Sequence, residues 1–332
     1  MKILKSIPIY CTLAVFALGS VQLSAQSVTT TPVGYVKLTI KGTGGQGSEA
    51  FSYLGVPMHH AADFQNVITA TADNSITCAN AGWTLNEYEN SYYIMILSGT
   101  NTGMSTTITG NTGDTLTTAD NLSQVLTGDE QFAIHKYTTI ADVFGATNSA
   151  GLRGGAHSGL ADNILIQTGS SSFSTYYYKD SGPIGGVGWR GANPTVDASQ
   201  TIIPHGAGII VVRGEPTDIT ITVLGSVFPK DVVTPIEAGF NWKTASIPTD
   251  VTLANLFGPN NEAMLQGGAH SGLADNILVF DANGNITTYY YKNVGLIGGI
   301  GWRGANPTSD QADTVIARPG EMFLINRSGG GA

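Results

Sequence analysis

A stretch of 42 residues occurs twice in this chain, and the repetition limits the possible folds more than any other feature does. Residues 154–195 and 267–308 align without a gap at an offset of 113 residues, and 29 of the 42 positions are identical. Each copy contains GGAHSGLADNIL, TYYYK and GWRGANPT in that order. Because a pattern that returns at a fixed spacing is typical of tandem structural units, we expect two homologous modules.

The segments between and around these motifs predict an all-β protein. Short runs of β-branched and aromatic residues alternate with turns rich in Gly, Asn, Ser and Asp, and the chain contains 43 glycines but only 12% charged residues. This pattern favours many short antiparallel strands over an α/β fold. We therefore expect an N-terminal antiparallel meander followed by two homologous sandwich-like or barrel-like β-units with short helical turns.

The first 25 residues have the pattern of a cleaved signal peptide. Lys2 and Lys5 precede an apolar run at 7–18, and a small residue, Ala25, stands at the expected cleavage point. The apolar run is too short to span a bilayer, although an uncleaved anchor is the alternative. The predicted division of the chain is a signal peptide at 1–25, a meander region at 26–138, repeat units at 139–225 and 226–328, and a flexible tail at 329–332.

Local patterns predict the individual elements. In the first region we expect strands at 33–40 and 51–58, a short helix at 59–64, a strand pair within 67–78, and strands at 92–97, 105–109, 114–118 and 131–136. In each repeat unit, a Thr and a Gly bracket a short helix at 139–145 and 252–258. A hairpin of 164–167 with 175–179 follows, then a second hairpin of 201–204 with 209–213, and the second unit repeats both. Further strands are expected at 219–224 and 240–247.

Charge and cysteine content exclude several classes of protein. The net charge of −9 becomes −11 once the two lysines of the signal peptide are removed, which argues against nucleic acid as a partner. Cys11 lies in the signal peptide and Cys78 is the other cysteine, so the mature chain has no internal disulfide. Its stability in an oxidising compartment must then come from a large core. The pattern predicts no cofactor and no catalytic residue.

Two histidine–aspartate pairs are the candidate metal ligands. His157 with Asp162 recurs as His270 with Asp275, and both residue types can bind a divalent ion. Each unit supplies only two such groups, however, and a metal site needs three or four. The favoured alternative is that each Asp accepts hydrogen bonds from backbone amides of its glycine-rich loop.

An aromatic set in each repeat is the candidate ligand-binding surface. Aromatic rings with polar ends suit sugars or protein surfaces, whereas packing inside the module is the alternative that we favour. The candidate residues are Tyr176, Tyr178, Trp189 and Arg190, with Tyr289, Tyr291, Trp302 and Arg303 in the second copy.

Some segments of the two copies have diverged, and others are unchanged. The hairpin turns at 168–172 and 281–285 share no residue, while the GGAHSGLADN and GWRGANP loops are unchanged. This indicates that the loops make contacts that the turns do not make, and contact between the two units is one such possibility.

The repeat also resembles a known class of sequence. A strand ending near Pro, a short helix, an Asp-Asn-Ile-Leu strand, a Tyr-rich strand, a Gly-Trp-Arg loop and a Pro-Gly turn follow one another between residues 240 and 325. This order resembles a family of exported β-rich proteins of Gram-negative environmental bacteria, to which no activity is assigned. The resemblance implies an exported β-protein.

We therefore expect an exported, non-enzymatic structural or interaction protein of the cell surface or extracellular matrix. Self-assembly through strand edges is one version of this hypothesis. The alternatives are a carbohydrate-binding module that uses the Tyr, Trp and Arg sets, and a metal-dependent enzyme that uses the His and Asp pairs. The expected partners are further copies of the chain, other surface proteins or glycans. The expected location is outside the cell or at its surface, with the periplasm as an alternative.

Overall fold

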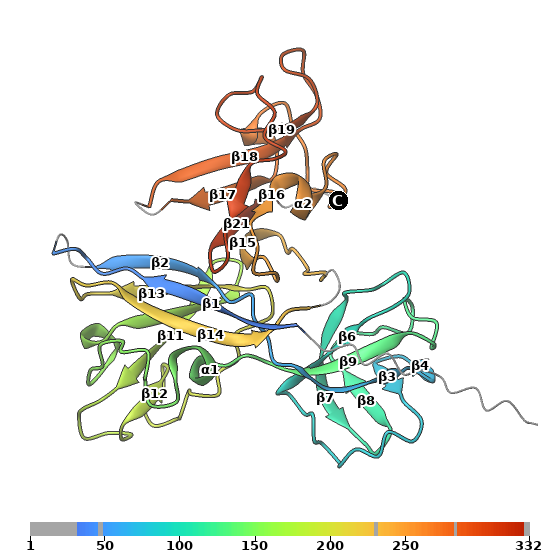
Figure 1. The fold of residues 1–332 in the computed structure, drawn as a ribbon, viewed down its shortest axis with the longest axis vertical. Helices are drawn as coiled ribbons and strands as arrows, with labels where there is room; N and C mark the ends of the chain where they lie inside the picture. Colours follow the sequence, from blue (N-terminus) through green and yellow to red (C-terminus); the bar gives the residue numbers. More distant parts are fainter. Residues whose placement is uncertain (1–31, 46–48, 229–231, 282–283, 329–332) are drawn as a thin grey trace, which may run out of the picture. The chain divides into compact units, whose positions relative to one another are not determined.

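The computed structural model describes residues 32–45, 49–228, 232–281 and 284–328, which belong to one unit, Thr31–Ala332 (Figure 1). The predicted signal peptide and C-terminal tail lie outside the described residues. Apart from two α-helices of five residues and two turns of 3-10 helix, the regular structure is β-strand, and the named strands pair antiparallel. The prediction of an all-β fold is confirmed.

The first repeat unit is built on a five-stranded sheet in the order β12-β11-β10-β13-β2. β13 lies between β10 and β2 and is buried along its whole length, as its apolar sequence GIIVVR predicts. The strands are β2 (Ala50–Gly55), β10 (Asn163–Gly169), β11 (Ser172–Lys179), β12 (Gly188–Arg190) and β13 (Gly208–Arg213).

The second repeat unit has the same sheet, with the strand order β15-β21-β17-β18-β19. β15 takes the place of β2, and β21 takes the place of β13. A short ladder of β16 with β20 packs beside it, where the first unit has only an isolated bridge between Thr139 and Ile202. The strands are β15 (Gly239–Thr244), β16 (Val251–Thr252), β17 (Asn276–Phe280), β18 (Ile286–Lys292), β19 (Gly301–Arg303), β20 (Val315–Ala317) and β21 (Met322–Arg327).

The edge strands β2 and β15 reach their sheets by different routes. In the second unit, β15 is followed directly by β16 and the helix. In the first unit, a complete seven-stranded sheet lies in the chain between β2 and the helix. Strand pairing therefore assigns Val33–Ile40 and Ala50–Gly55 to the first repeat unit, although the sequence-based division placed both in the region 26–138.

The inserted seven-stranded sheet has the order β3-β9-β6-β7-β8-β5-β4 and its own apolar core. Ile94, Ile108 and Phe132 have no exposed surface and lie at its centre. The strands are β3 (Ala62–Val67), β4 (Ala70–Ala72), β5 (Ser75–Thr77), β6 (Tyr92–Ile96), β7 (Ser105–Asn111), β8 (Thr115–Thr118) and β9 (Gln131–Lys136).

A two-stranded ribbon supplies the second layer of the first repeat unit. β1 (Val33–Ile40) pairs with β14 (Ile219–Ser226) along its full length. Alternate residues of β1 are buried, as the two-residue period of a strand requires, and they join Ile164 and Ile209 of the main sheet in one core. The apolar core of the first unit thus lies between ribbon and sheet.

The two helices begin and end as their sequences predict. In α1 (Ile140–Phe144), the Thr139 hydroxyl accepts from Asp142 N at 3.3 Å, and Thr139 N donates to the Asp142 carboxylate at 2.8 Å. This reciprocal pair satisfies two backbone N–H groups at the helix start. α2 (Leu253–Phe257) has the same Thr cap, and Gly145 and Gly258 end the two helices.

Two local predictions are wrong. The segment predicted as a helix at 59–64 runs into β3, which pairs with β9 and packs Phe64 against the core, because ladder hydrogen bonds to a neighbouring strand outweigh a weak local preference. The hairpin predicted for 201–204 with 209–213 does not form. β13 pairs with β10 and β2 instead, and Ile202 bridges Thr139. The equivalent hairpin of the second unit does not form either, since β20 pairs with β16 and β21 pairs with β15 and β17.

The two repeat units contact each other through equivalent parts. Gly55 N donates to Gly320 O at 2.9 Å, and the equivalent Thr244 N donates to Gly206 O at 3.0 Å. Tyr53 of β2 stacks on Trp242, its counterpart in β15, with 6.0 Å between the ring centroids and 1° between the planes. Because equivalent residues exchange roles across this contact, the units are related by a pseudo-twofold axis.

Candidate functional site

A groove of about 690 Å³ opens beside β11 in the first repeat unit. Its walls are the segment 156–158, strand β11 and the chain on both sides of β12. β12 pairs only with the last three residues of β11, so that residues 173–176 lie beyond its end and border the groove. A volume of this size is typical of sites for small molecules or extended segments.

The residues that line this groove are retained in the second unit. Twelve of the fifteen are identical, and the exceptions are Phe173, Ser174 and Pro183, which correspond to Ile286, Thr287 and Leu296. The retained set includes exposed positions such as His157 and His270. The hairpin turn at 168–172 is also exposed and is entirely different in the second copy. Packing alone therefore does not explain why the groove is unchanged.

Apolar side chains next to the groove project into solvent in both units. Two consecutive glycines at positive φ, Gly185 (82°) and Gly186 (67°), turn this loop, and Gly298 (81°) and Gly299 (69°) repeat the turn. Three equivalent pairs are more than half exposed, namely Leu160 with Leu273 (55% and 57%), Ile184 with Ile297 (59% and 66%) and Val187 with Ile300 (64% and 67%). We call each set an apolar loop patch; that of the second unit also contains Val294 and the fully exposed Leu296.

The tryptophans of the predicted aromatic set lie in the cores of their units. Trp189 and Trp302 have no exposed surface. Trp189 Nε1 donates to Gly145 O at 2.8 Å, and Trp302 Nε1 donates to Gly258 O at 2.9 Å. Each indole thus ties the end of the short helix to the sheet, and neither ring is placed to contact a ligand.

The arginines that follow the tryptophans organise the apolar loops. Arg190 is almost completely buried, and its guanidinium donates to Trp189 O at 2.7 Å and to Gly185 O at 2.5 Å. Arg303 makes the same two bonds, to Trp302 O and Gly298 O. Because these donors are used inside the loop, the arginines hold the two-glycine turn in place.

The tyrosines of the set are divided between core and groove. Tyr178 and Tyr291 contact the buried indoles edge-on, with centroids 5.3 and 5.2 Å apart. Tyr176 packs against the core of the first unit and also lines the groove, and Tyr289 is its equivalent. Of the predicted aromatic residues in the first unit, Tyr176 is the one that lines the groove.

The predicted histidine–aspartate pairs are separated by burial. Asp162 is buried and accepts from Arg153 N at 2.8 Å, from Gly214 N at 3.1 Å and from Arg213 Nε at 3.2 Å. Asp275 likewise accepts from Gln266 N and Ser328 N, both at 2.8 Å. His157 and His270 are exposed on the loops. In the part of the chain that the structure describes, no three His, Cys, Asp or Glu side chains are grouped so that they could hold a metal ion.

The duplicated loops are held within their own units. Gly155 N donates to Tyr178 O and Gly268 N to Tyr291 O, both at 3.1 Å, and the Asp, Trp and Arg bonds described above also stay within one unit. Contact between the units is made instead by β2, β15, the starts of β13 and β21 with the turns before them, and residues of the β10–β11 hairpin and of β17. The unchanged loops are therefore not explained by the interface between the repeats.

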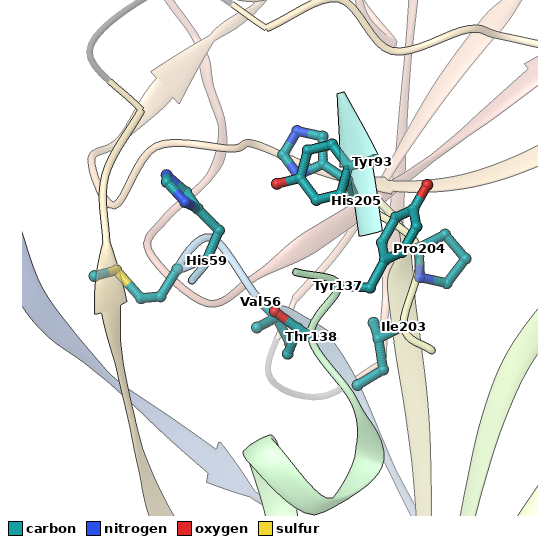
Figure 2. Close-up of a pocket in the computed structure, with 9 residues that line it drawn as sticks. Val56, His59, Tyr93, Tyr137, Thr138, Ile203, Pro204 and His205 are labelled. Carbon is teal, nitrogen blue, oxygen red and sulfur yellow. The ribbon is translucent and has the colours of Figure 1, made fainter. Parts of the chain in front are cut away.

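A second, much smaller cavity lies where the inserted sheet meets the first repeat unit (Figure 2). Its volume of about 20 Å³ is room for about one water molecule. Figure 2 shows His59, Tyr93, Tyr137 and His205 around it. These side chains come from the segment before β3, from β6, from the end of β9 and from the turn before β13.

Two buried histidines, His59 and His135, and a partly exposed one, His205, surround this junction. His59 Nδ1 lies 2.8 Å and His135 Nδ1 lies 3.0 Å from the carbonyl oxygen of His60, so both rings donate to one acceptor in their neutral form. His59 stacks on Phe228, and His205 lies parallel to Tyr93. Burial lowers the pKa of His59 to about 4 and that of His205 to about 3, and it also lowers the pKa of His135. The cluster is therefore uncharged at neutral pH.

Comparison with family models, with curated proteins and with solved structures finds no match for this chain. The resemblance to exported β-rich proteins accordingly stays a prediction. Among the residues that the structure describes, neither α-helix has the length and apolar character needed to cross a membrane.

Sequence reasoning missed both the groove and the histidine junction. The pair His59-His60 was visible in the sequence, but His135 and His205 are far away along the chain and only the fold brings them together. The signal that could have identified the groove is the identity of its lining residues in the two copies, which sequence analysis instead divided between a metal pair and an aromatic set.

Proposed function

We propose that this chain is an exported, non-enzymatic interaction protein that connects components of the cell surface or extracellular matrix through two equivalent surfaces, one on each repeat unit. The observation that carries the proposal is that the exposed residues around the groove of the first unit recur at the equivalent positions of the second, while equally exposed hairpin turns have diverged. Two like surfaces on one chain allow it to join two ligands, with a gain in avidity when both are engaged.

Export is the second part of the proposal. It is supported by the basic and apolar pattern of the first 25 residues. Fractionation of the producing cells, followed by sequencing of the mature N-terminus, tests it directly. We expect cleavage before Gln26 and recovery of the protein outside the inner membrane. Recovery of the full-length chain in the cytoplasm would contradict export.

Binding is tested with envelope and matrix material prepared from the producing cells. The mature protein should bind this material saturably, and the double variant Ile184→Asn/Ile297→Asn should lose most of that binding. The matched control is Leu85→Asn/Leu224→Asn, which changes two apolar residues of similar exposure away from the grooves. Absence of saturable binding, or equal loss in both variants, would contradict the proposal.

A glycan ligand is the second candidate, and the composition of the groove favours it. Tyr176, Tyr177, Ser158 and His157 place aromatic and hydroxyl groups around a volume large enough for a short oligosaccharide. The exposed His157 and His270 offer a test that leaves the core intact. On a glycan array, the wild type should bind a defined sugar class and His157→Ala/His270→Ala should not; an array without binding removes this candidate.

A further inference from the structure

We infer that the ligand of the groove in the first repeat unit is an acidic glycan, whose carboxylate or sulfate group binds the ammonium of Lys179. Lys292 offers the same group at the equivalent position of the second unit. This inference rests on the proposed function, because it names the chemical class of ligand for the same two surfaces. It is carried by the burial of these lysines, by their hydrogen bonds and by the composition of the groove wall.

Lys179 and Lys292 are buried cations without a counter-charge. They are only 2% and 3% exposed. Within the described ranges of the chain, no carboxylate forms an ion pair with either ammonium, whereas the buried Arg213 pairs with Asp162. Burial of a charge without a counter-charge destabilises a fold. A lysine that both units keep at this cost therefore indicates a use other than folding.

The hydrogen bonds of the two lysines differ, unlike those of the neighbouring arginines. Lys179 donates to Ser181 O, two residues further along, whereas Lys292 donates to Ile297 O, five residues further along. The two arginines described above use equivalent acceptors in both units. A lysine that served only to support its loop would be expected to do the same, so that loop support does not explain why it is retained.

The ammonium of Lys179 lies at the wall of the groove. Lys179, Gly182 and Ala156 all line it. A Cβ atom at Gly182 would stand 2.9 Å from Lys179 Nζ and 3.3 Å from the Cβ of Ala156, so that a side chain there would crowd the ammonium. Gly295 holds the equivalent place beside Lys292. An anion in the groove would then meet a charge that water scarcely reaches, where attraction is stronger than at an open surface.

The charges near the groove permit an anion there, although the chain has a net charge of −9. None of the fifteen lining residues is Asp or Glu. Asp180 is exposed next to Lys179, but Asn293 replaces it in the second unit. Asp197 lies 3.4 Å from Arg190, so that this pair has no net charge, and the second unit repeats it. Repulsion from more distant carboxylates is screened beyond about 8 Å at physiological ionic strength.

The remaining lining residues favour a sugar over an acidic peptide. The hydroxyl groups of Ser158, Ser174 and Thr175 line the groove, and in the part of the chain that the structure describes they have no hydrogen-bond partner. Ser or Thr stands at all three equivalent positions of the second unit. Hydroxyl groups both donate and accept, as those of a sugar do, and the ring of Tyr176 offers a surface for the apolar face of a sugar.

An array of carboxylated, sulfated and neutral glycans tests the inference. We expect the mature protein to bind a carboxylated or a sulfated class, and the class that binds identifies the acid group. For the tightest-binding oligosaccharide, Lys179→Met/Lys292→Met should raise the Kd about tenfold or more in calorimetric titration, because it removes a hydrogen bond to a charged group. The control Lys37→Met/Lys136→Met removes the same charge outside the groove and should bind like the wild type.

Thermal unfolding separates a binding lysine from a structural one. Methionine has a similar volume and no charge, so that Lys179→Met/Lys292→Met should keep or raise the unfolding midpoint. A lowered midpoint, binding that the double variant retains, binding of neutral glycans alone, an array without binding, or lysine-dependent binding of polyglutamate without any glycan overturns the inference. If envelope material is still bound and Ile184→Asn/Ile297→Asn still abolishes that binding, the proposed function stands and only this inference fails.

Discussion

The two repeat units have the same sheet but differ in how each obtains its edge strand. In the second unit, β15 and the rest of the sheet are close in sequence, whereas in the first unit β2 is separated from its sheet by the inserted seven-stranded sheet. The sheet order is nevertheless identical. This teaches that the position of an edge strand is defined by its ladder to β13 or β21 and by its buried face, and not by the length of the connection.

The contact between the units shows a second kind of difference. Where one unit has a small residue, the other has a large one that fills the space. A side chain at Gly55 would overlap Thr244, its own counterpart, and a side chain at Gly208 would overlap Met322, which replaces it in the second unit. Phe280 stacks on Tyr53 at 4.3 Å, while its counterpart Gln167 accepts from Trp242 N at 3.1 Å. The repeats have thus become complementary to each other at the interface, while the residues that line the groove of the first unit have stayed alike in the second.

The largest effect expected from this comparison is the loss of either buried indole. Trp189→Ala and Trp302→Ala should each lower the free energy of unfolding by about 3–5 kcal/mol, because each leaves a cavity in the core and frees a helix end. Urea denaturation followed by circular dichroism measures this, with the exposed Leu85→Ala as the control. If either Trp variant keeps its stability, the equivalence of the two cores is wrong.

The next largest expected effect is a loss of stability at acidic pH, confined to the first unit and its inserted sheet. Because the pKa of His59 is lowered from 6.5 to about 4, the unfolded chain takes up a proton that the folded chain excludes. The free energy of unfolding should therefore be greatest above pH 6.5 and fall as the pH drops from 6.5 to 4, by roughly 3 kcal/mol for this group.

Denaturation at several pH values measures this fall. His205→Gln should make it smaller, since it removes a second histidine whose pKa burial lowers. A chain whose stability does not change between pH 7 and pH 4 would show that the junction does not exclude protons. A loss located in the second unit would show that the destabilised site is elsewhere.

Substitution of the two buried aspartates by Asn should lower the free energy of unfolding by unequal amounts. Asp162 pairs with Arg213, which is itself buried, so that Asp162→Asn leaves an uncompensated charge and should cost about 3 kcal/mol. Asp275 lies 4.0 Å from Arg327, whose side chain is 45% exposed, and Asp275→Asn should cost roughly 1 kcal/mol. Unfolding free energies of the two variants test the difference, and the pair Asp162→Asn/Arg213→Met should recover part of the loss. Equal losses would contradict the expected asymmetry.

A further effect, smaller than those of Trp189→Ala and Asp162→Asn, concerns the complementary interface. Gly208→Met makes the first unit resemble the second, and its overlap with Met322 should cost about 2 kcal/mol. The exchanged pair Gly208→Met/Met322→Gly should be more stable than Gly208→Met alone. Unfolding free energies from urea titration provide the comparison. If the exchange recovers nothing, the two positions are not coupled across the contact.

Much of the local structure follows from the sequence. The bracketing Thr and Gly residues predicted both helices, and β9 has the bounds expected for a strand at 131–136. The strand predicted at 33–40 is β1, and the alternation of its apolar residues matches its buried face. These features depend on caps, turns and side-chain periodicity, which involve residues near one another in the chain.

The candidate site was less predictable. The repeat identified the correct loops, but the residues selected within them were largely the buried ones. Large aromatic and charged residues such as Trp189 and Arg190 are the obvious candidates for binding, but both are buried and support the loop from inside. The exposed residues of this loop are the aliphatic Ile184 and Val187. A sequence does not state whether a large side chain in a glycine-rich loop points inward, because the path of the loop decides this.

The sequence by itself therefore determined the class of fold, the duplication, the helix caps and most of the strands, since each depends on short-range chemistry. Only the tertiary structure decided that the first unit is interrupted by a complete sheet, that three distant histidines meet at one junction, and that the contact between the units leaves their loop patches free. These features arise from pairing and packing between segments far apart in the chain, where many arrangements satisfy the same local preferences and burial selects one. The repeated stretch predicted two equivalent modules, and the fold shows which of its side chains remain exposed to a partner.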